Sequence, residues 1–186
     1  MQRTVYAVLA LVVLATALAG CVGVQGPETT EEFDRTVAVE PGSGIVVTNR
    51  NGNVAVNVRE GNDVGITAVK RSVYGRGELD KVRIEVTEGD PLRIETVHDG
   101  VNPRVSVDYT ISLPPTVVLQ RIESSNGGIE LAGVRVTETE LLTSNGPIRV
   151  SGAPGGDLVA TSSNGRIEPS LDPQIRTFLS HSALEP

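Results

Sequence analysis

Residues 143–152 read TSNGPIRVSG, and closely similar stretches lie at 124–133 (SSNGGIELAG) and 162–171 (SSNGRIEPSL). The Asn-Gly pair therefore recurs every 19 residues, and a fixed period is typical of repeat proteins. Each pair could close a separate β-hairpin, or the same turn could recur in coils that stack on one another. The choice decides the fold class.

Residues at matching positions before and after the Asn-Gly pairs are alike from one repeat to the next, and these columns of like residues favour stacking. Asn-Gly between alternating strands is also a strong hairpin signal, and it would be consistent with a meander of hairpins in a sandwich. However, a hairpin does not require its flanking residues to recur in register, whereas stacked coils do. We therefore predict an all-β β-solenoid, similar to a parallel β-helix, with coils of ~19 residues. The apolar columns that carry this prediction are Ile122, Leu141 and Ala160 before the turns and Ile129, Ile148 and Ile167 after them.

An earlier Asn-Gly pair at 51–52 lies 75 residues before the second pair, which is one residue short of four periods. Glycine after asparagine is expected to supply the positive φ of a sharp corner. Residues 62–113 break the period and contain longer alternating runs, so we expect longer strands there, with antiparallel pairing left open. The predicted corner residues are Asn51, Gly52, Asn126, Gly127, Asn145, Gly146, Asn164 and Gly165.

The first 20 residues resemble a lipoprotein signal peptide. Arg3 precedes an apolar run, and Leu18-Ala19-Gly20-Cys21 resembles a lipobox, so Cys21 is the expected site of lipidation. A plain secretory signal with an incidental cysteine and a retained membrane-spanning anchor are the alternatives. The largely apolar stretch at 5–19 is shorter than the ~20 residues that a spanning helix needs.

Four segments are expected along the chain. Residues 1–20 form the signal peptide, 21–36 a flexible tether, 37–172 the β-solenoid domain and 173–186 an irregular tail or cap. Phe178 and Leu179 are the tail residues that could cover the open end of the coils.

Composition excludes several classes of protein. The formal net charge is −7, and cleavage before Cys21 would remove Arg3 and leave −8. An acidic chain without a basic run argues against nucleic-acid binding and against electrostatic adhesion to anionic lipid. The single cysteine excludes a disulfide within the chain, so stability must come from burial of an aliphatic core and from backbone hydrogen bonds.

A resemblance to a known family follows from three features together. They are the lipobox, a strand ending in Ile111-Ser112-Leu113-Pro114, and the repeated (Ser/Thr)-Ser-Asn-Gly-x-Ile units. In this combination the chain resembles the "putative adhesin" family of bacterial and archaeal envelope proteins, over roughly residues 36–170. The resemblance implies a β-solenoid-like domain outside the membrane and brings no catalytic residues.

The residues suited to catalysis do not form a recognisable pattern. His98 falls in an expected turn and His181 in the expected tail, so a Ser-His-Asp site is disfavoured. Glu123, Glu130 and Glu168 lie near the corners, but the coil between has Leu142 and Arg149 in the matching places. No metal or cofactor motif is visible, and we expect neither.

The sequence therefore predicts a non-enzymatic, extracytoplasmic protein that is attached to the membrane by a lipid anchor. Its expected role is a scaffold for weak multivalent contacts with an unidentified envelope or extracellular partner, not with nucleic acid. The alternatives are a structural envelope element that self-associates and, less favoured, a carbohydrate-active enzyme that uses Glu123 and Glu130.

Overall fold

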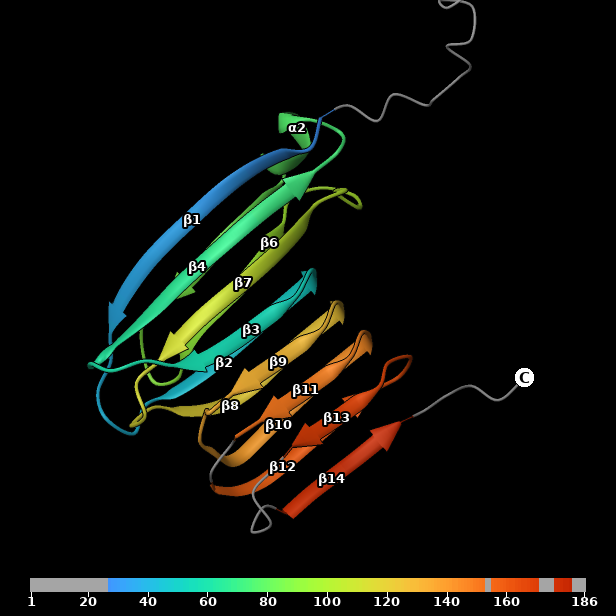
Figure 1. Ribbon diagram of the computed structural model, residues 1–186. Coiled ribbons are helices and arrows are strands. Elements are labelled where there is room, and N and C mark those ends of the chain that lie inside the picture. Colours follow the sequence, from blue (N-terminus) through green and yellow to red (C-terminus); the bar gives the residue numbers. More distant parts are fainter. Residues whose placement is uncertain (1–26, 153–154, 171–175, 182–186) are drawn as a thin grey trace, which may run out of the picture.

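Two seven-stranded sheets make up the computed structural model (Figure 1), which describes residues 27–152, 155–170 and 176–181. The first sheet has the order β1 (Thr29–Ala38), β4 (Asp63–Ser72), β7 (Ser106–Leu113), β3 (Val54–Val58), β9 (Ile129–Ala132), β11 (Ile148–Ser151), β13 (Ile167–Ser170). The second has the order β14 (Arg176–His181), β12 (Gly155–Ser162), β10 (Val136–Asn145), β8 (Val118–Asn126), β2 (Gly44–Asn51), β6 (Leu92–His98), β5 (Val82–Thr87). A short helix, α2 (Arg76–Leu79), links β4 to β5.

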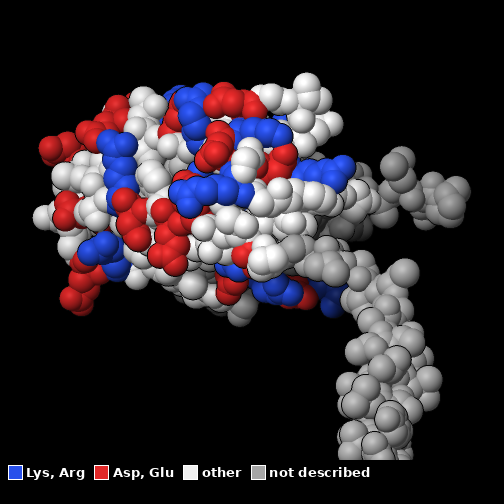
Figure 2. Space-filling model, turned by 90° about the horizontal axis from the view of Figure 1, so that it is seen from above, with Lys and Arg blue, Asp and Glu red and all other residues white. Residues whose placement is uncertain are grey.

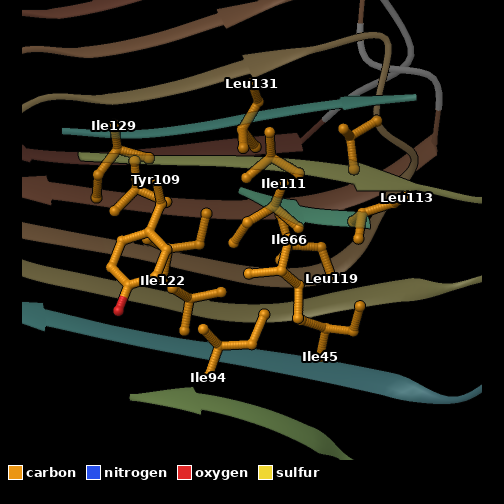
Figure 3. Close-up of a cluster of buried hydrophobic side chains, with 14 of the residues drawn as sticks. Ile45, Ile66, Ile94, Tyr109, Ile111, Leu113, Leu119, Ile122, Ile129 and Leu131 are labelled. Atoms are coloured by element: carbon orange, nitrogen blue, oxygen red, sulfur yellow. The ribbon is translucent and has the colours of Figure 1, made fainter. Parts of the chain in front are cut away.

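One aliphatic cluster joins the inner faces of the two sheets (Figure 3). Alternation along each strand creates it: in β9, Ile129 and Leu131 are buried while Glu130 is exposed. Tyr109 is the one aromatic side chain among the fully buried residues of the described chain. The core therefore consists almost wholly of Val, Ile and Leu, as the composition indicates.

The Asn-Gly turns connect one sheet to the other. They carry the chain from β2 to β3, from β8 to β9, from β10 to β11 and from β12 to β13. Because the two strands at each turn belong to different sheets, none of these turns closes a hairpin.

Successive 19-residue repeats pair in parallel and in register. Ile148 lies opposite both Ile129 and Ile167, and Leu141 lies opposite both Ile122 and Ala160. Asn51 lies opposite Asn126, so the chain returns to the same register after the 75-residue detour. The predicted pairing of like positions is confirmed.

The predicted fold class is wrong, because the sheets are mixed. β4 runs antiparallel to β1 and to β7, and β5 runs antiparallel to β6. Residues 88–91 link β5 to β6, and so short a link permits an antiparallel neighbour but not a parallel crossover. The domain is consequently two open, mixed sheets and not a parallel β-solenoid.

Both predicted domain boundaries also need correction. Residues 29–36, assigned to the tether, belong to β1, which pairs with β4 and packs Phe33 and Val37 toward the core. Residues 176–181, assigned to an irregular tail, form β14, which pairs in parallel with β12 at the same 19-residue offset. Cys21 and the proposed signal peptide lie outside the described residues.

Candidate functional surface at the Asn-Gly turns

The predicted corner residues lie together at one side of the domain (Figure 1). Asn51, Asn126 and Asn145 are the last residues of β2, β8 and β10, and Asn164 follows β12. Parallel pairing of these strands brings the four turns into one column.

The four asparagine side chains form a hydrogen-bonded ladder. The Nδ2 atom of Asn126 donates to Oδ1 of Asn51 over 2.9 Å, Asn145 donates to Asn126 over 2.8 Å, and Asn164 donates to Asn145 over 3.0 Å. Each inner amide thus acts as donor to one neighbour and acceptor from the other, as in stacked Asn ladders. The ladder fixes a row of uncharged amides at the solvent-exposed edge.

A second column, of hydroxyl groups, lies beneath the ladder. Two residues before each Asn, the hydroxyls of Ser124, Thr143 and Ser162 donate to carbonyl oxygens of the turn before, over 3.3, 2.9 and 3.1 Å. The acceptors are Gly52, Gly127 and Gly146. These buried hydroxyls supply hydrogen-bond donors to the turn carbonyls, of which that of Gly52 also accepts from Nδ2 of Asn49.

The glycines of the turns are required mainly by close backbone approach, which corrects the sequence-based reason. Only Gly52 of the four has positive φ, at 112°. A Cβ atom at Gly127, Gly146 or Gly165 would lie 1.9, 2.2 or 1.8 Å from the carbonyl oxygen of the glycine one turn before. No side chain fits at such distances, so the column of glycines sets how closely the turns stack.

The first turn differs from the others because Asn49 replaces the hydroxyl residue. Its Nδ2 donates to the carbonyl oxygen of Val107 over 2.9 Å, and its Oδ1 accepts from the Thr96 hydroxyl over 2.9 Å. The Tyr109 hydroxyl lies 2.8 Å from that of Thr96. Burial raises the pKa of Tyr109 to about 12, against a smaller lowering by the Thr96 hydrogen bond.

A further row of small hydroxyl side chains lies next to the asparagine ladder, on the outer face of the second sheet. Ser125, Ser144 and Ser163 precede the three later asparagines and line a shallow hollow of about 300 Å³ together with Thr161 and Leu142. We call Ser125, Ser144, Ser163 and the asparagines Asn126, Asn145 and Asn164 the turn surface.

Charged side chains on the outer faces pair across neighbouring strands. On the first sheet, Arg149 of β11 binds Glu168 of β13 over 3.1 Å; on the second, Arg121 of β8 binds Glu140 of β10 over 2.8 Å. Arg121 also binds Glu123 of its own strand over 3.0 Å. Figure 2 shows Lys and Arg interspersed with Asp and Glu, so the face in view carries no field of a single sign.

The candidate catalytic residues are not brought together. Glu123 lies on β8 of the second sheet and Glu130 on β9 of the first, with the core between them, and Arg149 stands between Glu130 and Glu168. His98 ends β6, where burial and then the charge of Arg50 lower its pKa. His181 lies on β14. No group of three or more His, Cys, Asp or Glu suited to a metal ion occurs in the described chain.

Sequence reasoning missed two groups of residues. The Asn49, Thr96 and Tyr109 network joins three strands, and the contact of Arg104 with the Tyr74 ring joins two loops. Both depend on pairings far apart in the sequence. The one sequence signal for the Asn49 network is that Asn49 stands where the later repeats have Ser or Thr. No local signal indicates the contact between Arg104 and Tyr74.

No protein-family model and no curated protein matches the chain. A crystal structure of a "putative adhesin" from Bacteroides fragilis resembles it with a TM-score of 0.49 and 14% identity, covering 74% of this chain and 61% of that one. A "putative cell adhesion protein" from Clostridium sporogenes gives a TM-score of 0.40 and 13% identity over 72% of this chain and 73% of its own. A "putative lipid binding protein" from Parabacteroides distasonis gives 0.41 and 10% over 83% and 68%. The chain thus spans about three fifths of the first of these proteins.

Proposed function

We propose that the protein is a non-enzymatic, lipid-anchored surface protein of the adhesin type, which presents its turn surface to other envelope or extracellular components. The lipobox at Cys21 and the family resemblance of the Asn-Gly repeats support this assignment. Among the described residues, no helix is both long and apolar enough to cross a membrane.

The observation that carries the proposal is the exposed asparagine ladder with its flanking serine column. Each repeat adds one amide and one hydroxyl at the spacing of paired strands, roughly 4.8 Å. The amides are already held by one another, so a partner meets a preorganised row of donors and acceptors at little entropic cost. Such a row suits weak, repeated contacts along an extended polar polymer or protein edge.

The test is a pair of arginine substitutions. Ser144→Arg places a long cation at the centre of the turn surface, whereas Thr110→Arg places the same side chain on the exposed outer face of the first sheet. Binding of the labelled full chain to isolated cell-envelope fractions is measured as a function of concentration. We expect Ser144→Arg to weaken binding by about tenfold or more and Thr110→Arg to leave it unchanged. Equal binding by both variants, or no saturable binding of the unchanged chain, contradicts the proposal.

A second candidate function is self-association into a structural element of the envelope. Each sheet has two edge strands, β1 and β13 in the first and β5 and β14 in the second, and edges can pair with another chain. Charges on β1 and β5 and Pro169 in β13 oppose such pairing, so β14 is the edge that favours it. Sedimentation velocity over a wide concentration range separates the two functions, because a strict monomer removes this candidate.

A further inference from the structure

An exposed apolar and basic cluster lies at the α2 end of the domain, away from the turn surface of the later repeats. Of the five large hydrophobic side chains that the described residues expose, three lie there: Val73, Tyr74 and Val101. Val101 is 92% exposed and Tyr74 is 58% exposed. Two of them, Tyr74 and Val101, border a hollow of about 360 Å³ together with the basic side chain of Arg104. We call Tyr74, Val101 and Arg104 the docking cluster.

The docking cluster is held in place by contacts from three segments. The guanidinium carbon of Arg104 lies 4.4 Å from the centre of the Tyr74 ring, in a cation–π contact. The Ser72 hydroxyl donates to the Arg104 carbonyl oxygen over 2.9 Å, and the Arg104 amide donates to the Glu78 carboxylate over 2.9 Å. Arg104 and the Tyr74 ring are therefore held together on one surface before any partner arrives, and Val101 lies beside them at the same hollow.

The N-terminal end of β1 lies beside this cluster. Thr29, the first residue of β1, pairs with Ser72, two residues before Tyr74, and Figure 1 shows α2 next to this end of β1. Thr29 follows Cys21 by eight positions, with seven residues between them. A fully extended chain spans at most about 3.6 Å per residue, so a lipid on Cys21 keeps this end within roughly 30 Å of the bilayer.

We propose that the docking cluster rests on the bilayer that holds the Cys21 lipid, with Tyr74 and Val101 in the headgroup region and Arg104 beside lipid phosphates. This inference rests on the proposed lipid anchor. Tyrosine is typical of membrane interfaces because its ring is apolar and its hydroxyl polar, and arginine binds phosphate through several N–H groups. The nearby Glu78 carboxylate already accepts hydrogen bonds from Lys81 and from the Arg104 amide. These two hydrogen bonds, that of Lys81 first, lower the pKa of Glu78.

The anchor is needed for this contact. One tyrosine and one valine bury too little apolar surface for lasting membrane binding, and the net charge of the chain is unfavourable for approach to anionic lipid. A tether of seven residues raises the local concentration of the bilayer enough for a weak contact to persist. Because β1 and β14 occupy opposite edges of the two sheets, docking at the β1 end directs the last repeats away from the membrane.

The chain contains no tryptophan, so single tryptophans report on the contact. Val101→Trp and Tyr74→Trp place the probe in the docking cluster, and Val159→Trp, at a 39% exposed position on β12, is the matched control. Each full chain is purified from membranes and reconstituted in vesicles of phosphatidylcholine and phosphatidylglycerol in about a 3:1 ratio, with and without brominated acyl chains. Unchanged thermal unfolding of the variants shows that the probes leave the fold intact.

We expect brominated lipid to reduce the fluorescence of the tryptophans at 74 and 101 by about twofold or more, and that at 159 to change little. Adding Arg104→Ala to Val101→Trp should lower the quenching. Vesicle flotation separates the two proposals. A chain that floats with the vesicles but shows equal quenching at all three positions overturns the docking and leaves the anchor standing. A chain that does not float overturns the anchor and the docking with it.

Discussion

At the scale of single residues, polar groups buried in an aliphatic core have the most specific roles. Asn49, Thr96 and Tyr109 connect strands of both sheets at the point where the repeats meet the longer strands. A buried hydroxyl or amide without a partner costs about 1–3 kcal/mol, so each of these three side chains depends on the others.

Tyr109 makes the stability of the domain sensitive to alkaline pH. Its pKa is about 12 in the folded chain and about 10 in an unfolded one. Between these two pH values the unfolded state loses a proton that the folded state keeps. The contribution of Tyr109 to stability is therefore fully present below pH 10 and is lost as the pH rises toward 12. The expected loss is about 2–3 kcal/mol.

Denaturant unfolding at a series of pH values from neutral to 12 tests this, with Tyr109→Phe as the control. The variant is expected to be less stable at neutral pH by about 1 kcal/mol, because Thr96 loses a partner, but to lose less stability in alkali. Parallel pH profiles for the two proteins would contradict the assignment.

The glycine column gives a second residue-scale prediction. A Cβ at Gly146 would lie 2.2 Å from the carbonyl oxygen of Gly127, so Gly146→Ala must push two turns apart. We expect the free energy of unfolding to fall by about 2–4 kcal/mol. Gly77→Ala is the comparison, since a Cβ there meets nothing within 4 Å and alanine favours the helix. Equal stability of the two variants would show that the turns are not in close contact.

At the scale of elements, a buried lysine fastens the edge strand β1 and helix α2 to the sheets. The Nζ atom of Lys70 donates to the carbonyl oxygens of Val82 over 3.1 Å and Leu79 over 3.4 Å, and it forms an ion pair with Glu31 of β1. Removal of one partner from a buried ion pair leaves the other without compensation.

The chain has only two lysines, and this makes the role of Lys70 testable. The side chain of Lys81 is 47% exposed, whereas that of Lys70 is 9% exposed. An amine-reactive reagent should label Lys81 quickly and Lys70 only at the rate at which β1 or α2 opens. Lys70→Ala should speed hydrogen exchange in β1 and α2 while Lys81→Ala leaves it unchanged. Uniform faster exchange across both sheets would assign Lys70 to global stability instead.

The sequence predicts the elements of the repeat well because their pairing is local. Ile129, Ile148 and Ile167 recur at one spacing, so their register follows from the period alone. The pairing of β1 with β4 joins segments whose patterns are unrelated, and the Thr- and Glu-rich sequence of β1 has the composition of a tether. In the candidate site, the asparagine ladder was predictable from spacing, whereas the docking cluster arises from loops brought together by β4 and β7.

At the scale of the whole molecule, the mixed sheets divide the domain into two parts. Within the described residues, β1 to β7 contain all of the antiparallel pairs. From β8 onward each strand adds in parallel to an earlier strand of its own sheet, β8 to β2 and β9 to β3, and each later strand to the one that lies one repeat before it. Strands of the second part contact mainly their neighbours, so its stability should grow step by step with the number of repeats. The first part resembles an ordinary two-sheet domain, whose contacts are distant in sequence.

Removing one repeat tests this division. Deletion of residues 127–145 joins Asn126 to Gly146 and should place β11 beside β3 and β12 beside β8, with Asn164 donating to Asn126. We expect the shortened chain to fold cooperatively. Its free energy of unfolding should fall less steeply with urea concentration than that of the full chain, since less surface is exposed on unfolding. Deletion of 127–146 is the control: it removes one further residue, the turn glycine, and shifts the next strand by one position, which would turn its apolar side chains to the other face. If both deletions unfold alike, register across the repeats does not hold the second part together.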